Sequence, residues 1–278
     1  MKIGRKVILY TVLVALAVTT VAPLVWMVFT SLHPPLSQVP TPERLFRPRR
    51  WAFENYRSVL TYAQLPVARF AINSVVVTAA AVLFQLAICS AAAYGFARMQ
   101  FRGRDALFAV FMLTMMIPAT VMIVPLFLTV HKMGLLNTYL GLILPYPYLS
   151  TAFGTFLLRQ FFISLPRSLD EAARLDGASE FQIFWHIVLP ASKPALATLA
   201  AFGFIWCWTE FYWPMLATTT TDMRTLEVGL SIFKDAYGGQ NWPLQMTAAV
   251  IVMAPALIFF LLLQRYFVKG VVLSGVKG

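Results

Sequence analysis

The sequence predicts an all-α integral membrane protein, on the evidence of its apolar content, its few charges and the length of its apolar runs. Of 278 residues, 59% are hydrophobic and only 12% are charged, with a mean hydropathy of +0.73. A soluble domain of this size could not hide that much apolar surface behind so few charges. The runs approach the roughly 20 residues that a helix needs to cross a bilayer. Because they are continuously apolar, helices are favoured over the alternating strands of a membrane barrel.

Six apolar runs predict six transmembrane helices within a single domain of residues 1–278. Lys2, Arg5 and Lys6 precede the first run as they would precede the apolar core of a secretory signal. That run continues to Phe29, well beyond the 7–15 residues of such a core, so a retained helix is the favoured interpretation. The predicted spans are residues 7–31, 68–97, 106–130, 138–162, 194–217 and 244–267.

The distribution of basic residues predicts that both termini are cytoplasmic. With that orientation, thirteen of the 22 Lys and Arg residues lie inside, and six of the other nine lie in one connection, residues 44–69. Positive residues near the spans favour the inside, and charges far from a span weigh less. The same rule accounts for the net charge of +11 without a nucleic-acid partner, so the lipid bilayer is the expected environment.

The longest predicted cytoplasmic segment, residues 165–193, carries two helix-start signals. Ser168 and Glu171 form an S-x-x-E capping box, which predicts a short helix over residues 169–176. Gly177 can then adopt the left-handed conformation that ends a helix. Ser179 and Gln182 form the second box.

A second helix of this segment is predicted to present one apolar stripe, because its large apolar residues follow the i, i+3, i+4, i+7 pattern. They are Phe181, Phe184, Trp185 and Val188, and Pro190 and Pro194 mark an end or a bend. Local chemistry leaves two interpretations open: a solvated elbow between membrane helices, or a rigid unit that contacts a partner.

The same segment resembles the EAA motif of bacterial ABC-importer permeases, EAA-x3-G-x9-I-x-L-P. The matching residues are Glu171, Ala172, Ala173, Gly177, Ile187, Leu189 and Pro190. In that family the loop forms a coupling helix that sits in a cleft of a cytoplasmic ATPase. The resemblance therefore implies an ATPase-coupling role for these seven residues, with the loop between the fourth and fifth spans.

The resemblance to carbohydrate-type permeases extends along most of the chain, as in the stretches PLVWMVFTSLHPP (residues 23–35) and QRYFVKGVVLSGVKG (residues 264–278). It implies a non-catalytic permease subunit of the bacterial cytoplasmic membrane. This subunit would form the translocation pathway for a sugar or related polar solute, with glycerol 3-phosphate or another non-sugar solute as the alternative.

The resemblance also implies which other components complete the transporter. The chain itself would bind no cofactor and no metal, while ATP and Mg would be held by the partner ATPase. The implied partners are a second homologous permease as a heterodimer, a cytoplasmic ATPase dimer and an extracytoplasmic solute-binding protein.

Four residues are candidates for the solute pathway: Trp208, Glu210, Tyr212 and Asn73. Glu210 is an acidic residue well within an apolar run, where a charge costs about 2.5–3.5 kcal/mol at a span centre. A continuous helix from Pro194 would place it about 24 Å along the axis. Aromatic neighbours suit sugar faces, but they also suit helix packing and interfacial belts, and both interpretations stay open. Thr209 stands where the family pattern often has Asn.

Two other classes of membrane protein are less consistent with the sequence. An intramembrane enzyme would need a catalytic or metal constellation, whereas His33, His131 and His186 are far apart and show no ligand spacing. An ion-coupled secondary transporter would usually carry more intramembrane charge. Prolines 118, 125, 145, 147 and 255 predict kinks in spans three, four and six.

Overall fold

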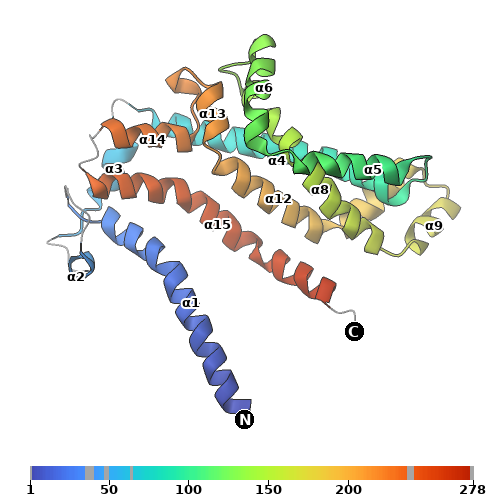
Figure 1. Ribbon diagram of the computed structural model, residues 1–278, viewed down its shortest axis with the longest axis horizontal. Helices are drawn as coiled ribbons and strands as arrows, with labels where there is room; N and C mark the ends of the chain where they lie inside the picture. Colours follow the sequence, from blue (N-terminus) through green and yellow to red (C-terminus); the bar gives the residue numbers. More distant parts are fainter. Residues whose placement is uncertain (1, 35–40, 47–49, 63–64, 237–240, 276–278) are drawn as a thin grey trace. The chain divides into compact units, whose positions relative to one another are not determined.

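The computed structural model describes residues 2–34, 41–46, 50–62, 65–236 and 241–275 (Figure 1). All regular structure in these residues is helical, which confirms the all-α class. Within these described ranges, three helices are long and apolar enough to cross a membrane alone: Lys6–Ser31, Val67–Arg98 and Trp242–Leu262. Three bent helix pairs bring the number to six if each pair is one span.

The chain folds as two compact units, of which the first comprises Met1–Arg69 and Leu226–Pro255. A buried amide organises this unit: Asn55 donates hydrogen bonds to the carbonyls of Ser31 (2.7 Å) and His33 (2.8 Å). Thr247 also donates to the Ser31 carbonyl, at 3.2 Å, so the carbonyl of the last residue of the first helix, which has no partner within the helix, is satisfied. The elements are α1 (Lys2–Ser31), α2 (Pro42–Leu45), α3 (Glu54–Leu60), α14 (Leu226–Ala236) and the first part of α15 (Trp242–Gly275).

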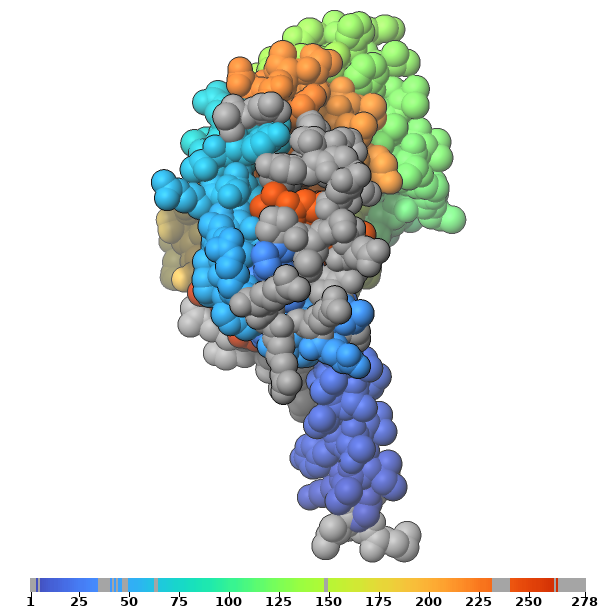
Figure 2. Space-filling model, turned by 90° about the vertical axis from the view of Figure 1, so that its left-hand side faces the viewer, coloured from blue at the N-terminus to red at the C-terminus, as the bar shows by residue number. Residues whose placement is uncertain are grey.

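Helix α1 keeps almost its whole apolar surface uncovered. Its most apolar stretch is 0% buried within the chain, and Figure 2 shows its side chains, in blue, bare along the helix. Val7, Leu13 and Val18 are each at least half exposed. Such a surface is stable in hydrocarbon and not in water, as expected for a helix in a bilayer.

The second unit comprises Phe70–Thr225 and Ala256–Gly278 and is built around one long helix, α4 (Val67–Arg98). Glycines let neighbouring helices approach it: a Cβ added at Gly154 would lie 2.6 Å from the Cys89 sulfur. Both cysteines, Cys89 and Cys207, are buried and free, as expected for small core residues. The other elements are α5 (Arg104–Leu113), η1 (Thr114–Met116), α6 (Ala119–Lys132), α7 (Tyr139–Ile143), α8 (Pro145–Ser164), α9 (Ser168–Leu175), α10 (Glu180–Ile183), η2 (Phe184–Val188), α11 (Leu189–Ala191), α12 (Lys193–Trp208), α13 (Tyr212–Ala217) and η3 (Thr221–Met223).

The predicted proline kinks occur at some prolines and not at others. The third run bends by 95° between Met116 and Ala119, where Pro118 takes an extended conformation, so residues 106–130 are not one straight helix. The fourth run bends by 48° after Pro147. Pro125 and Pro255 instead lie inside helices that continue through them.

The expectation of one continuous helix over residues 194–217 is wrong. Helix α12 ends at Trp208, and α13 begins only at Tyr212. Glu210 lies in the break, so the distance estimated along an unbroken helix does not apply. A bend of 77° also separates residues 180–191 from α12, as the flanking prolines Pro190 and Pro194 predicted.

Candidate coupling site and solute pathway

The first helix of the 165–193 segment, α9, begins one residue earlier than predicted. Arg167 is its N-cap, has helical backbone angles and makes no side-chain cap. Ser168 is therefore already inside the first turn, and its predicted capping box with Glu171 does not form. The N–H groups of Asp170 and Glu171 both bond to the Arg167 carbonyl instead.

The glycine and the second capping box form as predicted. Gly177 has φ +84°, a left-handed conformation that a side chain rarely adopts, and it ends the turn after α9. Ser179 and Gln182 then cap α10 reciprocally, each side chain bonding the other residue's backbone N–H. The chain is thereby fixed at both sides of the turn between the two short helices.

The predicted single apolar stripe is divided between two faces. Phe181 and Trp185 are 70% and 56% exposed and stack on each other, with ring centroids 6.2 Å apart. Val188 is instead fully buried. The π-helical turn η2 alters the register of the side chains, so the α-helical spacing assumed for the stripe does not hold here.

A hydrophobic core beneath the segment joins it to the rest of the second unit. Ala173, Ile183 and Val188 come from the segment itself. Their buried partners come from α4, α8 and α12, and they are Cys89, Ala93, Tyr94, Ala97, Leu158, Phe162, Ala195 and Leu199. The segment is therefore packed into the unit on one side, unlike a solvated elbow.

A buried ion pair fastens α9 to the last residue of α4. The Nη1 atom of Arg98 lies 3.1 Å from Oδ2 of Asp170, and the two side chains are 2% and 5% exposed. Arg98 also donates from Nη2 to the carbonyl of Leu165, at 3.0 Å. Removing one partner of such a pair leaves an uncompensated buried charge and costs about 3–5 kcal/mol.

A second, partly exposed set of polar contacts holds α10 to α4. Tyr94 donates to Oε2 of Glu180 at 2.7 Å, and Arg174 donates to Oε1 of Glu180 at 2.8 Å. The hydrogen bond from Arg174, and after it the one from Tyr94, stabilises the charged carboxylate and holds the pKa of Glu180 below its ordinary 4.5. Tyr94 thus holds α10, and Arg98 holds α9. Because Tyr94 and Arg98 are four residues apart in α4, both short helices are tied to about one turn of that helix.

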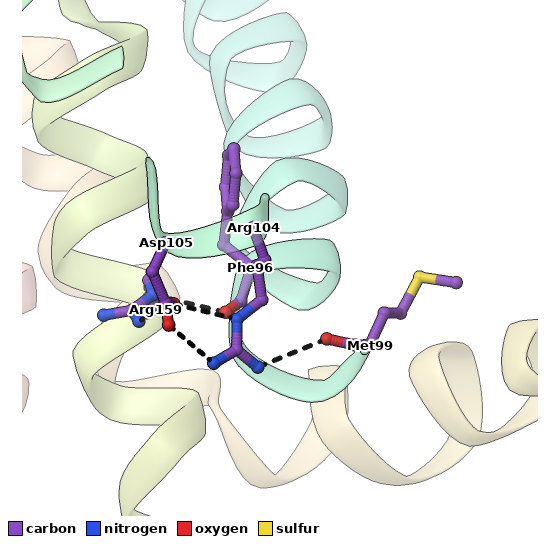
Figure 3. A network of polar contacts seen from close by, with 5 residues as sticks. All are labelled: Phe96, Met99, Arg104, Asp105 and Arg159. Atoms are coloured by element: carbon purple, nitrogen blue, oxygen red, sulfur yellow. Dashed lines mark hydrogen bonds and ion pairs between the residues drawn. The ribbon is translucent and has the colours of Figure 1, made fainter. Parts of the chain in front are cut away.

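Arg159 of α8 and Arg104 of α5 bond one carbonyl in the last turn of α4 and one just beyond its end (Figure 3). Arg159 donates to the Phe96 carbonyl at 3.3 Å, and Arg104 donates to the Met99 carbonyl at 3.4 Å. Both guanidinium groups also approach Asp105, at 3.8 and 2.9 Å. Cations at a helix C-terminus complement its partial negative charge, so this end of α4 is held on several sides.

The seven EAA-type residues lie partly on the surface and partly against the core. Ala173 is 9% exposed, while Ile187 and Leu189 are half-buried. The remaining four are exposed: Glu171, Ala172, Gly177 and Pro190. Leu175, at 89% exposure, adds a large apolar side chain to the outward side of α9.

The four pathway candidates occupy different environments. Glu210 accepts hydrogen bonds from the backbone N–H groups of Tyr212 (2.9 Å) and Trp213 (3.2 Å), so it caps α13. Trp208 is buried, whereas Tyr212 is 68% exposed. No candidate metal-binding group of three His, Cys, Asp or Glu residues exists in the part of the chain that the structure describes.

Asn73 is fully buried and its amide is engaged with protein. It donates to the carbonyls of Asp222 (2.7 Å) and Arg224 (2.9 Å) and accepts from the Tyr139 hydroxyl at 2.7 Å. Asn137 also holds this loop: its Oδ1 accepts from the N–H groups of Thr219 and Thr220. The loop over residues 217–225 is thus fixed by two neutral amides.

The contacts of Arg98 with Asp170 and of Tyr94 with Glu180 were not predicted from the sequence. Both acidic residues are visible in the segment, but periodicity does not tell which of them turns inward. The sequence offered one signal for the ion pair, which was the position of Arg98 directly after an apolar run. A basic residue at that position is equally expected as a charge that sets membrane topology.

The fold and this loop define a permease of the binding-protein-dependent importers. Residues 86–273 match the family described as binding-protein-dependent transport system inner membrane component, and the chain belongs to this family. It is therefore a non-catalytic permease subunit of an ABC importer, in which ATP is hydrolysed by a separate chain.

Named relatives and a solved structure agree with this assignment. The chain is 32% identical to the trehalose/maltose transport system permease protein MalG of Thermococcus litoralis, over 99% of this chain and 98% of MalG. It is 36% identical to the sn-glycerol-3-phosphate transport system permease protein UgpE of Yersinia pestis, over 74% and 73%. It also resembles a bacterial ABC transporter involved in the import of the acidic polysaccharide alginate, with a TM-score of 0.79, 25% identity and coverage of 94% and 96%.

Proposed function

We propose that this permease carries a sugar or related polar solute, and that its 165–193 segment docks on the ATPase through the outward side of α9. The observation that carries the docking proposal is the two-sided construction of α9. Ala173 packs into the core, while its neighbours Glu171 and Ala172 are exposed. A helix anchored on one side and bare on the other can receive a partner without unfolding.

The other EAA-type residues support the docking helix. Gly177 ends its turn, and Ile187, Leu189 and Pro190 lie in the second half of the segment, before α12. The small side chain of Ala172 allows a close approach by a partner. We infer that both termini and this segment face the cytoplasm, as the distribution of basic residues favours.

The chain acts within a larger assembly under this proposal. A second, homologous permease would complete a heterodimer, and an ATPase dimer would hold ATP and Mg. A solute-binding protein would deliver the solute from outside. Lipid or the second permease would cover the exposed apolar faces of α1 and α6. On α6, Val121 and Val124 are both 62% exposed.

The solute class rests on the relatives and on the aromatic residues around the break between α12 and α13. MalG and UgpE suggest two classes, sugars and glycerol 3-phosphate. Trp208, Glu210 and Tyr212 remain candidates for the pathway, as does Asn73 if its hydrogen bonds open during transport. Uptake of trehalose, maltose and glycerol 3-phosphate by the assembled importer would decide, and uptake of glycerol 3-phosphate alone would overturn the sugar assignment.

A cysteine crosslink tests the docking proposal directly. Both native cysteines are buried, so a cysteine at Ala172 would be the exposed thiol on the outward side of α9. We expect Ala172→Cys to crosslink to a cysteine in the cleft of the ATPase in the assembled complex. Ala173→Cys is the matched control, because this neighbouring side chain faces the core and should not crosslink. An assembled complex without the Ala172 crosslink would overturn the proposal.

A further inference from the structure

We propose that Arg98 and Asp170 are the positioning pair through which the 165–193 segment moves α4, and that α4 carries this movement to the loop over residues 217–225. The inference rests on the proposed docking of α9 on an ATPase. It goes further by naming the residues that connect the docking helix to a membrane-spanning helix.

The attachment of α9 to α4 is the first step in this transmission. The Arg98–Asp170 pair is nearly fully buried, since both side chains are at most 5% exposed. Coulomb attraction between unit charges is several times stronger in such an environment than at the surface. The Arg98 guanidinium spans two elements at once, Asp170 in α9 and the Leu165 carbonyl that precedes it. A displacement of α9 is therefore resisted by α4 through this pair, in addition to the packing of Ala173 in the core.

The second step is the stiffness of α4. This helix runs from Val67 to Arg98 with no proline inside it. At 1.5 Å per residue, Asn73 and Arg98 are about 37 Å apart along its axis. A continuous helix of that length transmits displacement as a rod, because its backbone hydrogen bonds have no break at which it could hinge.

The third step is the attachment at the other end of α4. The Asn73 amide nitrogen donates hydrogen bonds to the carbonyls of Asp222 and Arg224, and its oxygen accepts one from the Tyr139 hydroxyl. The same helix therefore holds the 165–193 segment by an ion pair at one end and the 217–225 loop by an amide at the other. Residues 209–211, at the break between α12 and α13, lie a few positions before that loop.

A cavity lies beside the ion pair. It has a volume of about 400 Å³ and is lined by three basic and three acidic side chains, together with Met99 and Gln100. The charged residues are Arg98, Arg167, Arg174, Asp170, Glu171 and Glu180. Because the lining charges of opposite sign are equal in number, they add no net charge that would draw Arg98 and Asp170 apart.

The test measures movement at the far end of α4 in the complete importer. Asp222 has an exposed side chain, and its own carbonyl is held by Asn73, so Asp222→Cys reports on the loop while the native cysteines are buried. The importer with its ATPase and binding protein is placed in liposomes, and the rate of maleimide labelling is compared with and without MgATP. We expect MgATP to change this rate at least threefold.

The variant Arg98→Met with Asp170→Asn removes both charges together, so no buried charge is left without a partner. We expect it to keep ATP hydrolysis within twofold and to abolish the MgATP-dependent change in labelling. Arg174→Gln is the matched control, because it breaks a partly exposed ion pair of the same segment and should leave the change intact. A full MgATP response in the double variant, or no response with the native pair, overturns the inference.

Two further measurements keep the test decisive. If the double variant does not assemble, Arg98→Lys is used. Lysine keeps the charge but lacks the two separate guanidinium nitrogens that contact Asp170 and the Leu165 carbonyl, so the MgATP-dependent change in labelling should fall by at least half. An unchanged response then overturns the inference. The Ala172→Cys crosslink is measured in parallel, because loss of that crosslink with the native pair refutes the docking proposal itself, whatever the labelling shows.

Discussion

The two ends of α4 are tied to their surroundings by different chemistry. At the Arg98 end, charged side chains hold the 165–193 segment, and the Arg98–Asp170 pair is nearly fully buried. At the Asn73 end, neutral amides of Asn73 and Asn137 hold the 217–225 loop. An ion pair attracts over a longer range than a hydrogen bond and tolerates changes of angle, whereas an amide fixes one geometry. The difference suits a segment that stays attached to α4 over a range of angles at one end and a loop that is held in one geometry at the other.

The largest expected effect is the loss of one charge at the Arg98 end. Arg98→Met leaves the Asp170 carboxylate buried without its cation, which should lower the free energy of unfolding by about 3–5 kcal/mol. Denaturant titration of the purified permease in detergent measures this. Arg174→Gln, at a partly exposed pair, should cost less than about 1 kcal/mol. Equal effects of the two variants would contradict the distinction between buried and exposed pairs.

The close packing near the Asn73 end should also be sensitive to added volume. A Cβ on Gly141 would overlap the carbonyl of Leu135, and the Gly141 carbonyl itself accepts from the Trp213 indole at 3.2 Å. Gly141→Ala should therefore destabilise by about 3 kcal/mol through backbone displacement. Gly95→Ala, in α4, is the control: nothing lies within 4 Å of its added methyl, and alanine favours a helix. Destabilisation by both would point to a nonspecific effect of the methyl group.

Removal of the amide at Asn73 should cost less than removal of Arg98. Asn73→Ala leaves two carbonyls and the Tyr139 hydroxyl without their partner, for which we expect about 2 kcal/mol. The measurement is the same unfolding titration, with proteolysis of the 217–225 loop as a second, local readout. If Asn73→Ala proves more costly than Arg98→Met, the amide is the stronger tie and the comparison of the two ends is reversed.

The smallest expected effect concerns Glu180. Its pKa is lowered by Arg174 and Tyr94, so its contribution to stability is present above the ordinary 4.5 and is lost as pH falls through the lowered value. Because the pair with Arg174 is partly exposed, the contribution should be about 0.2–1 kcal/mol. Glu180→Gln should melt below the native permease at pH 7, and the difference should shrink on acidification below pH 4.5. A difference that grows in acid would show the opposite sign of linkage.

Several features were predictable because they depend on neighbours in the chain. The apolar runs, the Gly177 turn and the Ser179–Gln182 cap all follow from local periodicity or local backbone geometry. The incorrect prediction of a capping box at Ser168 also has a local cause. The preceding Arg167 already has helical backbone angles, whereas a capping box needs an N-cap residue with extended angles. One residue of helix extension is enough to remove that cap.

The sequence by itself determined that this chain is a helical membrane protein with a coupling-type segment, because hydropathy, turn residues and motif spacing are written in order along the chain. Only the tertiary structure decided that Asp170 turns inward to Arg98, that Glu210 caps α13 at a break in the fifth apolar run, and that Asn73 is occupied by the 217–225 loop. Each of these depends on partners 2 to 151 positions away that share no periodicity with the residue they contact. Helix packing brings Asp170 to Arg98 and Asn73 to the 217–225 loop, and the high cost of leaving a buried polar group unpaired then fixes both contacts. At Glu210 the partners are neighbours in the chain, and the break between α12 and α13 frees their N–H groups.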